Sequence, residues 1–280
     1  MSRRFASFEC AGNQLIGTLD PAAATTGLLI VSGGNELRSG PWNSQAQIAE
    51  RVAAAGFPVF RFDRRGVGDS AGPNGGFETS APDIAAALAA FRAHVPTLKR
   101  VVAYGNCDAA AALMLAEGAG TAALVLANPW TFDPEPVATA EPVAEPAPVV
   151  TPAPTPRPPA ALRAHYLRRL TDPRALIRLL TGQVKLGKLA ASLGDAAKAN
   201  PAQTELAGRL VAGLAQFDGP ATILLTDRDR TAQAFIANWD KADSRLRTCP
   251  DATHSFVEPQ ARIWLLGQLL AALRSDTAPR

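Results

Sequence analysis

The sequence has few cysteines, few histidines and no long apolar run, and each shortage excludes a class of protein. Only 3 cysteines occur in 280 residues, so we expect neither a disulfide framework nor a cysteine-based zinc site. With 3 histidines and no cluster of acidic residues, we expect no metal centre, and no cofactor is predicted. No stretch reaches the roughly 18 consecutive apolar residues that a membrane-spanning helix needs.

The amino-terminal segment lacks the apolar core of a signal peptide, so the sequence predicts a protein of the reducing cytoplasm. Charged residues make up 19% of the chain, and the net charge is +3. No basic run is interleaved with aromatic residues, and we therefore expect no nucleic-acid partner. The apolar fraction of 47% is sufficient for a large core.

Strand-like and helix-like segments alternate along most of the chain. Short apolar runs, typical of strands, occupy residues 4–9, 14–19, 27–31, 57–62, 100–104, 122–126, 219–225 and 245–249. Helical patterns occupy about 41–55, 82–94, 108–118, 202–217, 231–239 and 258–273, and the last is expected to turn Ile263, Leu266, Leu269 and Leu270 toward the core. This alternation predicts an α/β fold with a doubly wound, mostly parallel sheet and a hairpin at one edge.

A different composition interrupts this pattern between the two parts of the predicted core, residues 1–130 and 200–275. Residues 131–160 are rich in proline and alanine, which predicts an extended linker. Residues 161–199 return to helical patterns with many arginines and lysines, and they predict a helical cap. We interpret these basic residues either as the solvated face of amphipathic helices or as a surface for an anionic substrate or partner.

The stretch 101–110 carries the most specific pattern. A β-branched apolar run ends at Gly105, Cys107 follows two residues later, and small residues then open a helical pattern. This resembles the nucleophile elbow G-x-S-x-G, with cysteine in place of serine and Ala109 in place of the second glycine. Gly105 and Ala109 must be small because the strand and the helix approach each other closely at such a turn.

Two further candidates follow later strands. Asp229 comes after the strand at 219–225, and His254 comes after the strand at 245–249. The carboxyl ends of parallel strands meet at one sheet edge, so Cys107, Asp229 and His254 predict a triad of nucleophile, acid and base. Asp227 is a rival for the acid, and either aspartate could instead cap the following helix.

Acyl chemistry also needs two N–H donors for the developing oxyanion. We expect one from the backbone of Asp108 and the other from the glycine-rich loop after residues 27–31, at Gly34 or Asn35. The carboxylate of Asp108 would disfavour a neighbouring thiolate. We therefore expect it to point away, toward Arg64 or Arg65, or to bind a substrate hydroxyl.

Together these motifs resemble the α/β-hydrolase superfamily. More narrowly, residues 31–36, 60–66, 105–110 and 126–130 resemble the exosortase A system-associated hydrolases, type 1. The resemblance covers nearly the whole chain apart from the proline-rich insertion. It implies the α/β-hydrolase fold and a setting beside bacterial exopolysaccharide and protein-sorting systems, but no particular substrate.

Two functions of different classes follow. The first is hydrolysis or transfer of an ester, thioester or lactone through Cys107, Asp229 and His254, with a covalent acyl-thioester intermediate and a small-molecule or acyl-carrier substrate. The alternative is a catalytically silent scaffold that keeps the fold and binds a partner. The residues that would bind the substrate are not predicted. Trp42, Trp130 and Trp239 are interpreted either as pocket residues or as core.

Overall fold

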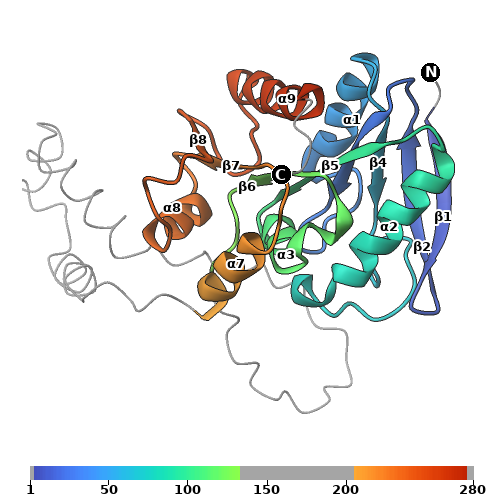
Figure 1. The fold of residues 1–280 in the computed structure, drawn as a ribbon, viewed down its shortest axis with the longest axis horizontal. Coiled ribbons are helices and arrows are strands. Elements are labelled where there is room, and N and C mark those ends of the chain that lie inside the picture. The colour runs from blue at the N-terminus through green and yellow to red at the C-terminus, as the bar shows by residue number, and fades with distance from the viewer. Residues whose placement is uncertain (1–2, 133–204, 276–280) are drawn as a thin grey trace, which may run out of the picture.

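The computed structural model describes residues 3–132 and 205–275 of the chain. The predicted helical cap at 161–199, and the linker from residue 133 onward, therefore lie outside the described residues. Within the described part, the predicted α/β architecture is confirmed: one sheet of 8 strands lies between two layers of helices (Figure 1).

The sheet is mostly parallel. Its order is β1-β2-β4-β3-β5-β6-β7-β8; β2 pairs antiparallel with β1 and with β4, and every other neighbouring pair is parallel. The strands are β1 (Arg4–Cys10), β2 (Asn13–Asp20), β3 (Thr26–Val31), β4 (Val59–Phe62), β5 (Arg100–Asn106), β6 (Ala123–Ala127), β7 (Ala221–Thr226) and β8 (Leu246–Cys249). The first two strands form the predicted edge hairpin.

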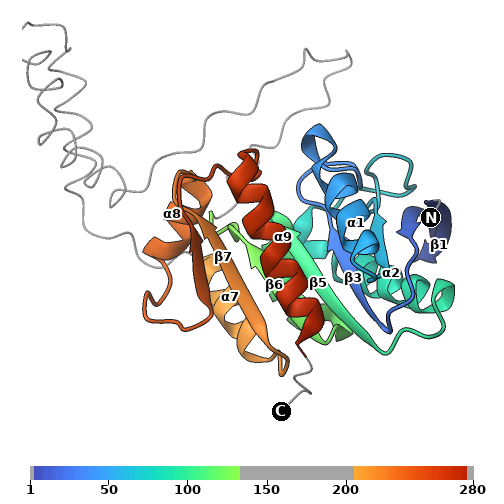
Figure 2. The same ribbon diagram turned by 90° about the horizontal axis from the view of Figure 1, so that it is seen from above.

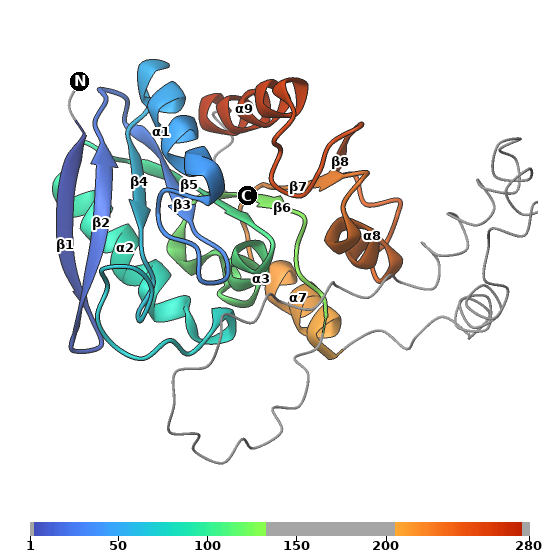
Figure 3. The ribbon, with the colours of Figure 1, turned by 180° about the vertical axis from the view of Figure 1, so that it is seen from behind.

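Helices cover both faces of the sheet, as Figure 3 shows from behind. The α-helices in the described residues are α1 (Ser44–Ala54), α2 (Ala81–His94), α3 (Asp108–Leu115), α7 (Glu205–Ala215), α8 (Arg230–Ala237) and α9 (Pro259–Arg274). Helices α1 and α9 lie on one face, and α2, α3 and α7 lie on the other (Figures 1 and 2).

Strand β3 illustrates why a continuous apolar run forms a central strand. Successive side chains point to opposite faces, so Leu29 and Val31 join the core under α2 and α3, whereas Leu28 and Ile30 join the core under α1 and α9. All four are at most 1% exposed. A strand buried on both faces therefore needs no polar alternation.

The prediction of which residues of the last helix face the core was partly wrong. Ile263 is 68% exposed, although it was predicted to face the core. The buried positions of α9 are Ala261, Leu265, Leu269 and Leu273, which recur every four residues along one stripe. Ile263 lies two residues from its nearest buried neighbours, which turns it to the opposite side of the helix. Leu266 and Leu270 flank the stripe and are partly buried.

The third helix also ends earlier than expected. It stops at Leu115, and a 3-10 turn follows at Glu117–Gly120. Gly118 and Gly120 in that turn both have positive φ angles, which a helix cannot continue through. In the described part of the chain, no helix combines the length and the apolar character needed to cross a membrane.

Candidate active site

Cys107 lies at the turn between β5 and α3, in a backbone conformation that residues other than glycine seldom adopt. Its φ is 63° and its ψ is −126°. Its N–H donates to the carbonyl of Ala127 at 2.9 Å, and its carbonyl accepts hydrogen bonds from the N–H groups of Ala110 and Ala111. Such strain costs roughly 1–3 kcal/mol, so these bonds hold the sulfur at the apex of a tight turn.

Close packing explains the small residues around the cysteine. A Cβ added to Gly105 would lie 2.7 Å from the carbonyl carbon of Ala109, which is shorter than any real contact of that kind. Ala109 itself is fully buried. The strand and the helix therefore touch backbone to backbone, as the spacing of the motif predicted.

His254 and Asp229 meet beside this turn. The Nδ1 atom of His254 lies 2.9 Å from Oδ2 of Asp229. The same carboxylate oxygen accepts the N–H of Ala232 at 3.0 Å, so Asp229 caps α8 and contacts the histidine at once. Asp227 instead is exposed and accepts the N–H of Ala252 at 3.3 Å. The structure thus brings Asp229, rather than its rival Asp227, to the imidazole.

The surroundings of His254 favour its protonated form. Burial alone lowers the pKa of this histidine, but hydrogen bonds to Asp229 and to Cys107, together with the charges of both partners, outweigh it and raise the pKa to about 10. The imidazole therefore contacts the carboxylate of Asp229 at Nδ1 and shares its pocket with the thiol of Cys107. An imidazolium held in this way stabilises a neighbouring thiolate, the nucleophilic form of cysteine.

All three side chains line one open pocket at the carboxyl edge of the sheet. The pocket is lined by Cys107, Trp130, Arg228, Asp229, Arg230, Thr231, Thr253 and His254. Two arginines from the segment after β7 therefore line the same pocket as Cys107. Their charge makes the pocket attractive to anionic groups.

Two asparagines, which the sequence analysis did not single out as site residues, hold the histidine loop. Asn106 and Asn128 each donate a side-chain N–H to the carbonyl of His254, at 3.2 Å in both cases. Asn128 also donates to the side chain of Asn106 at 3.1 Å and accepts the N–H of Thr226 at 2.9 Å. Its φ of 43° is left-handed, which asparagine tolerates better than most residues. An asparagine directly after a buried strand was the available sequence signal.

The loop that carries Gly34 contacts the side chain of Asp108, so one of the expected oxyanion donors is already hydrogen bonded. The N–H of Gly34 donates to both carboxylate oxygens of Asp108, each at 2.7 Å. Of the two arginines proposed as partners of that carboxylate, Arg64 lies 3.6 Å away, whereas Arg65 pairs with Asp83 at 2.5 Å. Burial raises the pKa of Asp108, although Arg64 and the N–H of Gly34 oppose this rise.

The other members of that loop make contacts of their own. The side chain of Asn35, the alternative oxyanion residue, accepts a hydrogen bond from Asn74 at 2.7 Å. Glu36 is half-buried, and burial, followed by the negative charge of Asp108, raises its pKa. Glu36 was not singled out from the sequence, because nothing in the sequence indicated that it lies near Asp108.

The remaining cysteines and tryptophans divide between core and pockets. Cys10 and Cys249 are buried. Trp130 lines the pocket around Cys107, and Trp42 lines a second cavity. Trp239 stacks on Phe235 with ring centroids 4.6 Å apart, so it belongs to the core.

A sequence model described as the alpha/beta hydrolase family matches residues 28–263, well over half of the chain. The chain belongs to the alpha/beta hydrolase family. Its sequence matches no curated protein.

Solved structures show the same fold at low sequence identity. An esterase of Pyrococcus furiosus, Pf2001, superposes with a TM-score of 0.59 at 12% identity, over 98% of this chain and 90% of that one. XC6422 from Xanthomonas campestris, described as an α/β serine hydrolase without a lid, gives 0.55 at 15% identity over 100% and 98% of the two chains. Est1E from Butyrivibrio proteoclasticus, solved with ferulic acid, gives 0.54 at 14% identity over 96% and 100%.

Proposed function

We propose that this hydrolase cleaves ester or thioester bonds through a thiolate of Cys107, with His254 as its acid–base partner and Asp229 orienting the imidazole. One observation carries the proposal: a cysteine at a strained strand–helix turn shares one pocket with a histidine whose Nδ1 lies 2.9 Å from a buried carboxylate. That is the arrangement of nucleophile, base and orienting acid that acyl transfer uses.

The first half of the reaction forms a thioester. The sulfur of Cys107 attacks the substrate carbonyl carbon, and the carbonyl electrons move onto oxygen. The resulting oxyanion is stabilised by the backbone N–H of Asp108 and by a second donor in the loop 33–35. When the tetrahedral intermediate collapses, the bond to the leaving oxygen or sulfur breaks, and the imidazolium of His254 protonates that leaving group.

The second half releases the acid. His254, now neutral, takes a proton from water, and the hydroxide formed attacks the thioester carbonyl. Collapse of the second tetrahedral intermediate breaks the carbon–sulfur bond and regenerates the thiolate beside the imidazolium. An alcohol in place of water would give acyl transfer instead. The same residues would serve in both cases.

The oxyanion site imposes a condition on this mechanism. While the N–H of Gly34 donates to the carboxylate of Asp108, it cannot also bind an oxyanion. We infer that the carboxylate leaves Gly34 when substrate binds, and that it moves toward Arg64, 3.6 Å away. Arg64 can accept this pairing, because its Nη1 is buried without a hydrogen-bond partner in the described part of the chain and can donate to the carboxylate.

An association with bacterial exopolysaccharide and protein-sorting systems follows only from the resemblance to exosortase A system-associated hydrolases, and it stays a prediction. A cytoplasmic location also stays a prediction. Arg228 and Arg230, which line the pocket, support an anionic substrate such as an acyl group on an acidic carrier. Structural relatives described as esterases or serine hydrolases support the ester class, although they do not bear on the use of cysteine.

The proposal is tested by combining labelling with turnover. The full chain is treated with iodoacetamide at neutral pH, the modified cysteine is located by mass spectrometry, and p-nitrophenyl esters of several acyl lengths are assayed in parallel. We expect Cys107 to be labelled first, Cys107→Ala to lose turnover, and His254→Ala to slow both labelling and turnover. Cys249→Ala, which alters a buried cysteine elsewhere, is the control.

Slow and equal labelling of all three cysteines, with no turnover of any ester, would overturn the proposal in favour of a silent scaffold. Cys107→Ser tests whether the thiol itself is needed, because serine keeps nearly the same side-chain shape and should preserve the fold. If the serine variant hydrolyses esters as fast as the natural chain, the reaction does not depend on a thiolate.

A further inference from the structure

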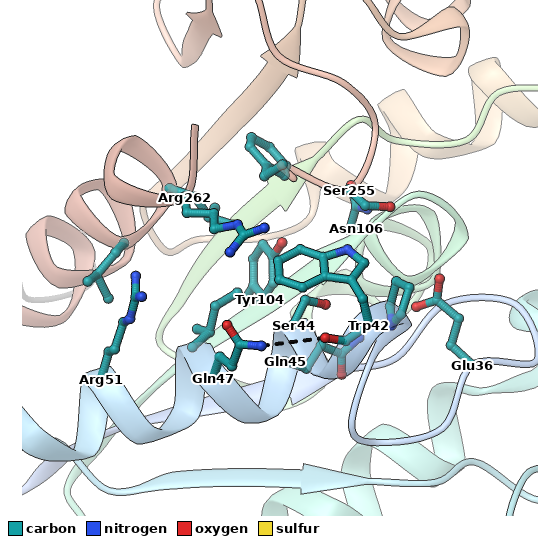
Figure 4. A pocket seen from close by; sticks show the side chains of 15 residues that line it. Glu36, Trp42, Ser44, Gln45, Gln47, Arg51, Tyr104, Asn106, Ser255 and Arg262 are labelled. Atoms are coloured by element: carbon teal, nitrogen blue, oxygen red, sulfur yellow. Dashed lines mark hydrogen bonds between the residues drawn. The ribbon is translucent and has the colours of Figure 1, made fainter. Parts of the chain in front are cut away.

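A second cavity lies between α1 and α9, on the face of the sheet that carries these helices. Its walls come from the segment 41–51, from α9 and from β5, and Figure 4 shows the side chains that line it. Neither Cys107 nor His254 lines it. We refer to it as the α1–α9 crevice. Its volume of about 40 Å³ accommodates a small polar group rather than a whole ligand.

Tyr104 forms part of its floor, and its hydroxyl faces the cavity. The residue is only 4% exposed, and within the described part of the chain its hydroxyl makes no hydrogen bond. Burial raises the pKa of Tyr104, so the hydroxyl stays protonated and is available as a donor. In Figure 4 this hydroxyl points into the space beside Trp42 and Arg262.

Arg262 supplies an unsatisfied donor at the same place. Its Nε atom is buried, and no hydrogen-bond partner for it is found among residues 3–132 and 205–275. Its guanidinium carbon lies 4.2 Å from the centroid of the Trp42 ring, a cation–π contact that holds the charge over the crevice. Trp42 is 38% exposed, so one side of the indole remains open to solvent.

We propose that the α1–α9 crevice binds the carboxylate of a small-molecule ligand whose apolar body lies against Trp42. The guanidinium offers only donors and a positive charge, and the protonated phenol beside it can donate as well, so an anionic acceptor complements the pair. The apolar walls at Ile48 and Leu265 suit a hydrocarbon or aromatic body. This site goes beyond the proposed hydrolysis and does not require Cys107 to be a nucleophile.

Glu36 selects among anions. It lines the same cavity, and Figure 4 places it at the far end, beyond Trp42 from Arg262. A carboxylate there repels a second negative charge on the ligand. A planar monoanion is therefore favoured over a dianionic phosphate ester.

The experiment measures binding of phenylacetate to the full chain by isothermal titration calorimetry. Phenylacetamide is the neutral analogue, and phenyl phosphate is the dianionic one. All titrations use a Cys107→Ala background, which removes the proposed chemistry from the measurement. Tyr104→Phe deletes only the hydroxyl, Arg262→Gln removes the charge, and Arg92→Gln, an exposed arginine of α2 on the opposite face, is the matched control.

We expect phenylacetate to bind at least roughly tenfold more weakly to Tyr104→Phe and to Arg262→Gln, and unchanged to Arg92→Gln. Phenylacetamide and phenyl phosphate are expected to bind more weakly than phenylacetate. Equal affinity of phenylacetate for all variants, absence of binding at millimolar concentration, or tighter binding of phenyl phosphate would each overturn the assignment. Circular dichroism of each variant confirms that it is folded.

Discussion

The pocket around Cys107 and the α1–α9 crevice differ in how their polar groups are satisfied. In the pocket, Asp229 accepts from both His254 and the N–H of Ala232, and the carbonyl of His254 accepts two asparagine side chains. In the crevice, Nε of Arg262 is buried without a partner in the described part of the chain, and the hydroxyl of Tyr104 points into the cavity (Figure 4).

This difference separates two kinds of site. A fully bonded cluster is held in one geometry, which suits a reaction whose transition state needs fixed dipoles. An unsatisfied buried donor costs roughly 1–3 kcal/mol until something accepts its proton, which suits a binding site. Substitutions in the pocket around Cys107 are therefore expected to lower turnover or stability. Removing a donor from the crevice is expected to leave the stability of the ligand-free protein nearly unchanged.

The largest effect is expected for Asp229→Asn. The asparagine oxygen still accepts the N–H of Ala232 and keeps α8 capped, but it no longer supports a protonated His254. Turnover should fall by about 10³–10⁴, with little change in stability. Asp227→Asn is the control two residues away, and its activity should be unchanged. Steady-state kinetics with a p-nitrophenyl ester measures both, and a loss confined to Asp227→Asn would point to Asp227 as the acid.

Asn128→Ala should cause the largest loss of stability. The side chain of Asn128 is fully buried, and its removal leaves the carbonyl of His254 and the N–H of Thr226 each short of one partner. Alanine also tolerates a φ of 43° less well. We expect a loss of about 2–4 kcal/mol in the free energy of unfolding, measured by urea denaturation. Asn238→Ala, which removes one hydrogen bond at the end of α8, should cost much less.

A smaller effect, an increase in turnover rather than a loss, is expected for Asp108→Ala. Removing the carboxylate frees the N–H of Gly34 for the oxyanion. Because one such donor is worth about 10²–10³ in turnover, partial competition by Asp108 should be relieved by roughly tenfold. Pre-steady-state acylation kinetics measures this gain. Asp69→Ala, which removes an exposed carboxylate, is the control, and a loss of activity in Asp108→Ala would show that the side chain assists the reaction.

The smallest effect is expected for Tyr104→Phe in the absence of ligand. The hydroxyl it removes has no partner in the described part of the chain, so the free energy of unfolding should change by less than about 0.5 kcal/mol. A destabilisation of several times that amount would mean that the hydroxyl is already bonded. The comparison between the two cavities would then lose its basis.

Much of the site could be predicted because its signals are local. A glycine two residues before Cys107, and two polar residues after later strands, are visible in the printed sequence. The parallel sheet places the ends of β5, β7 and β8 along one edge. Ile263 shows the limit of such reasoning, since an apolar residue in a helix does not reveal which side of that helix meets the sheet.

The sequence by itself determined the α/β alternation, the tight turn at Cys107 and the order in which Cys107, Asp229 and His254 follow their strands, because these depend on neighbours along the chain. The tertiary structure alone decided that Asp229 and not Asp227 meets His254, that Gly34 donates to Asp108, and that Tyr104 and Arg262 share one crevice. The physical reason is that these contacts join distant segments, and a hydrogen bond depends on ångström-scale distance and direction that residue spacing does not encode.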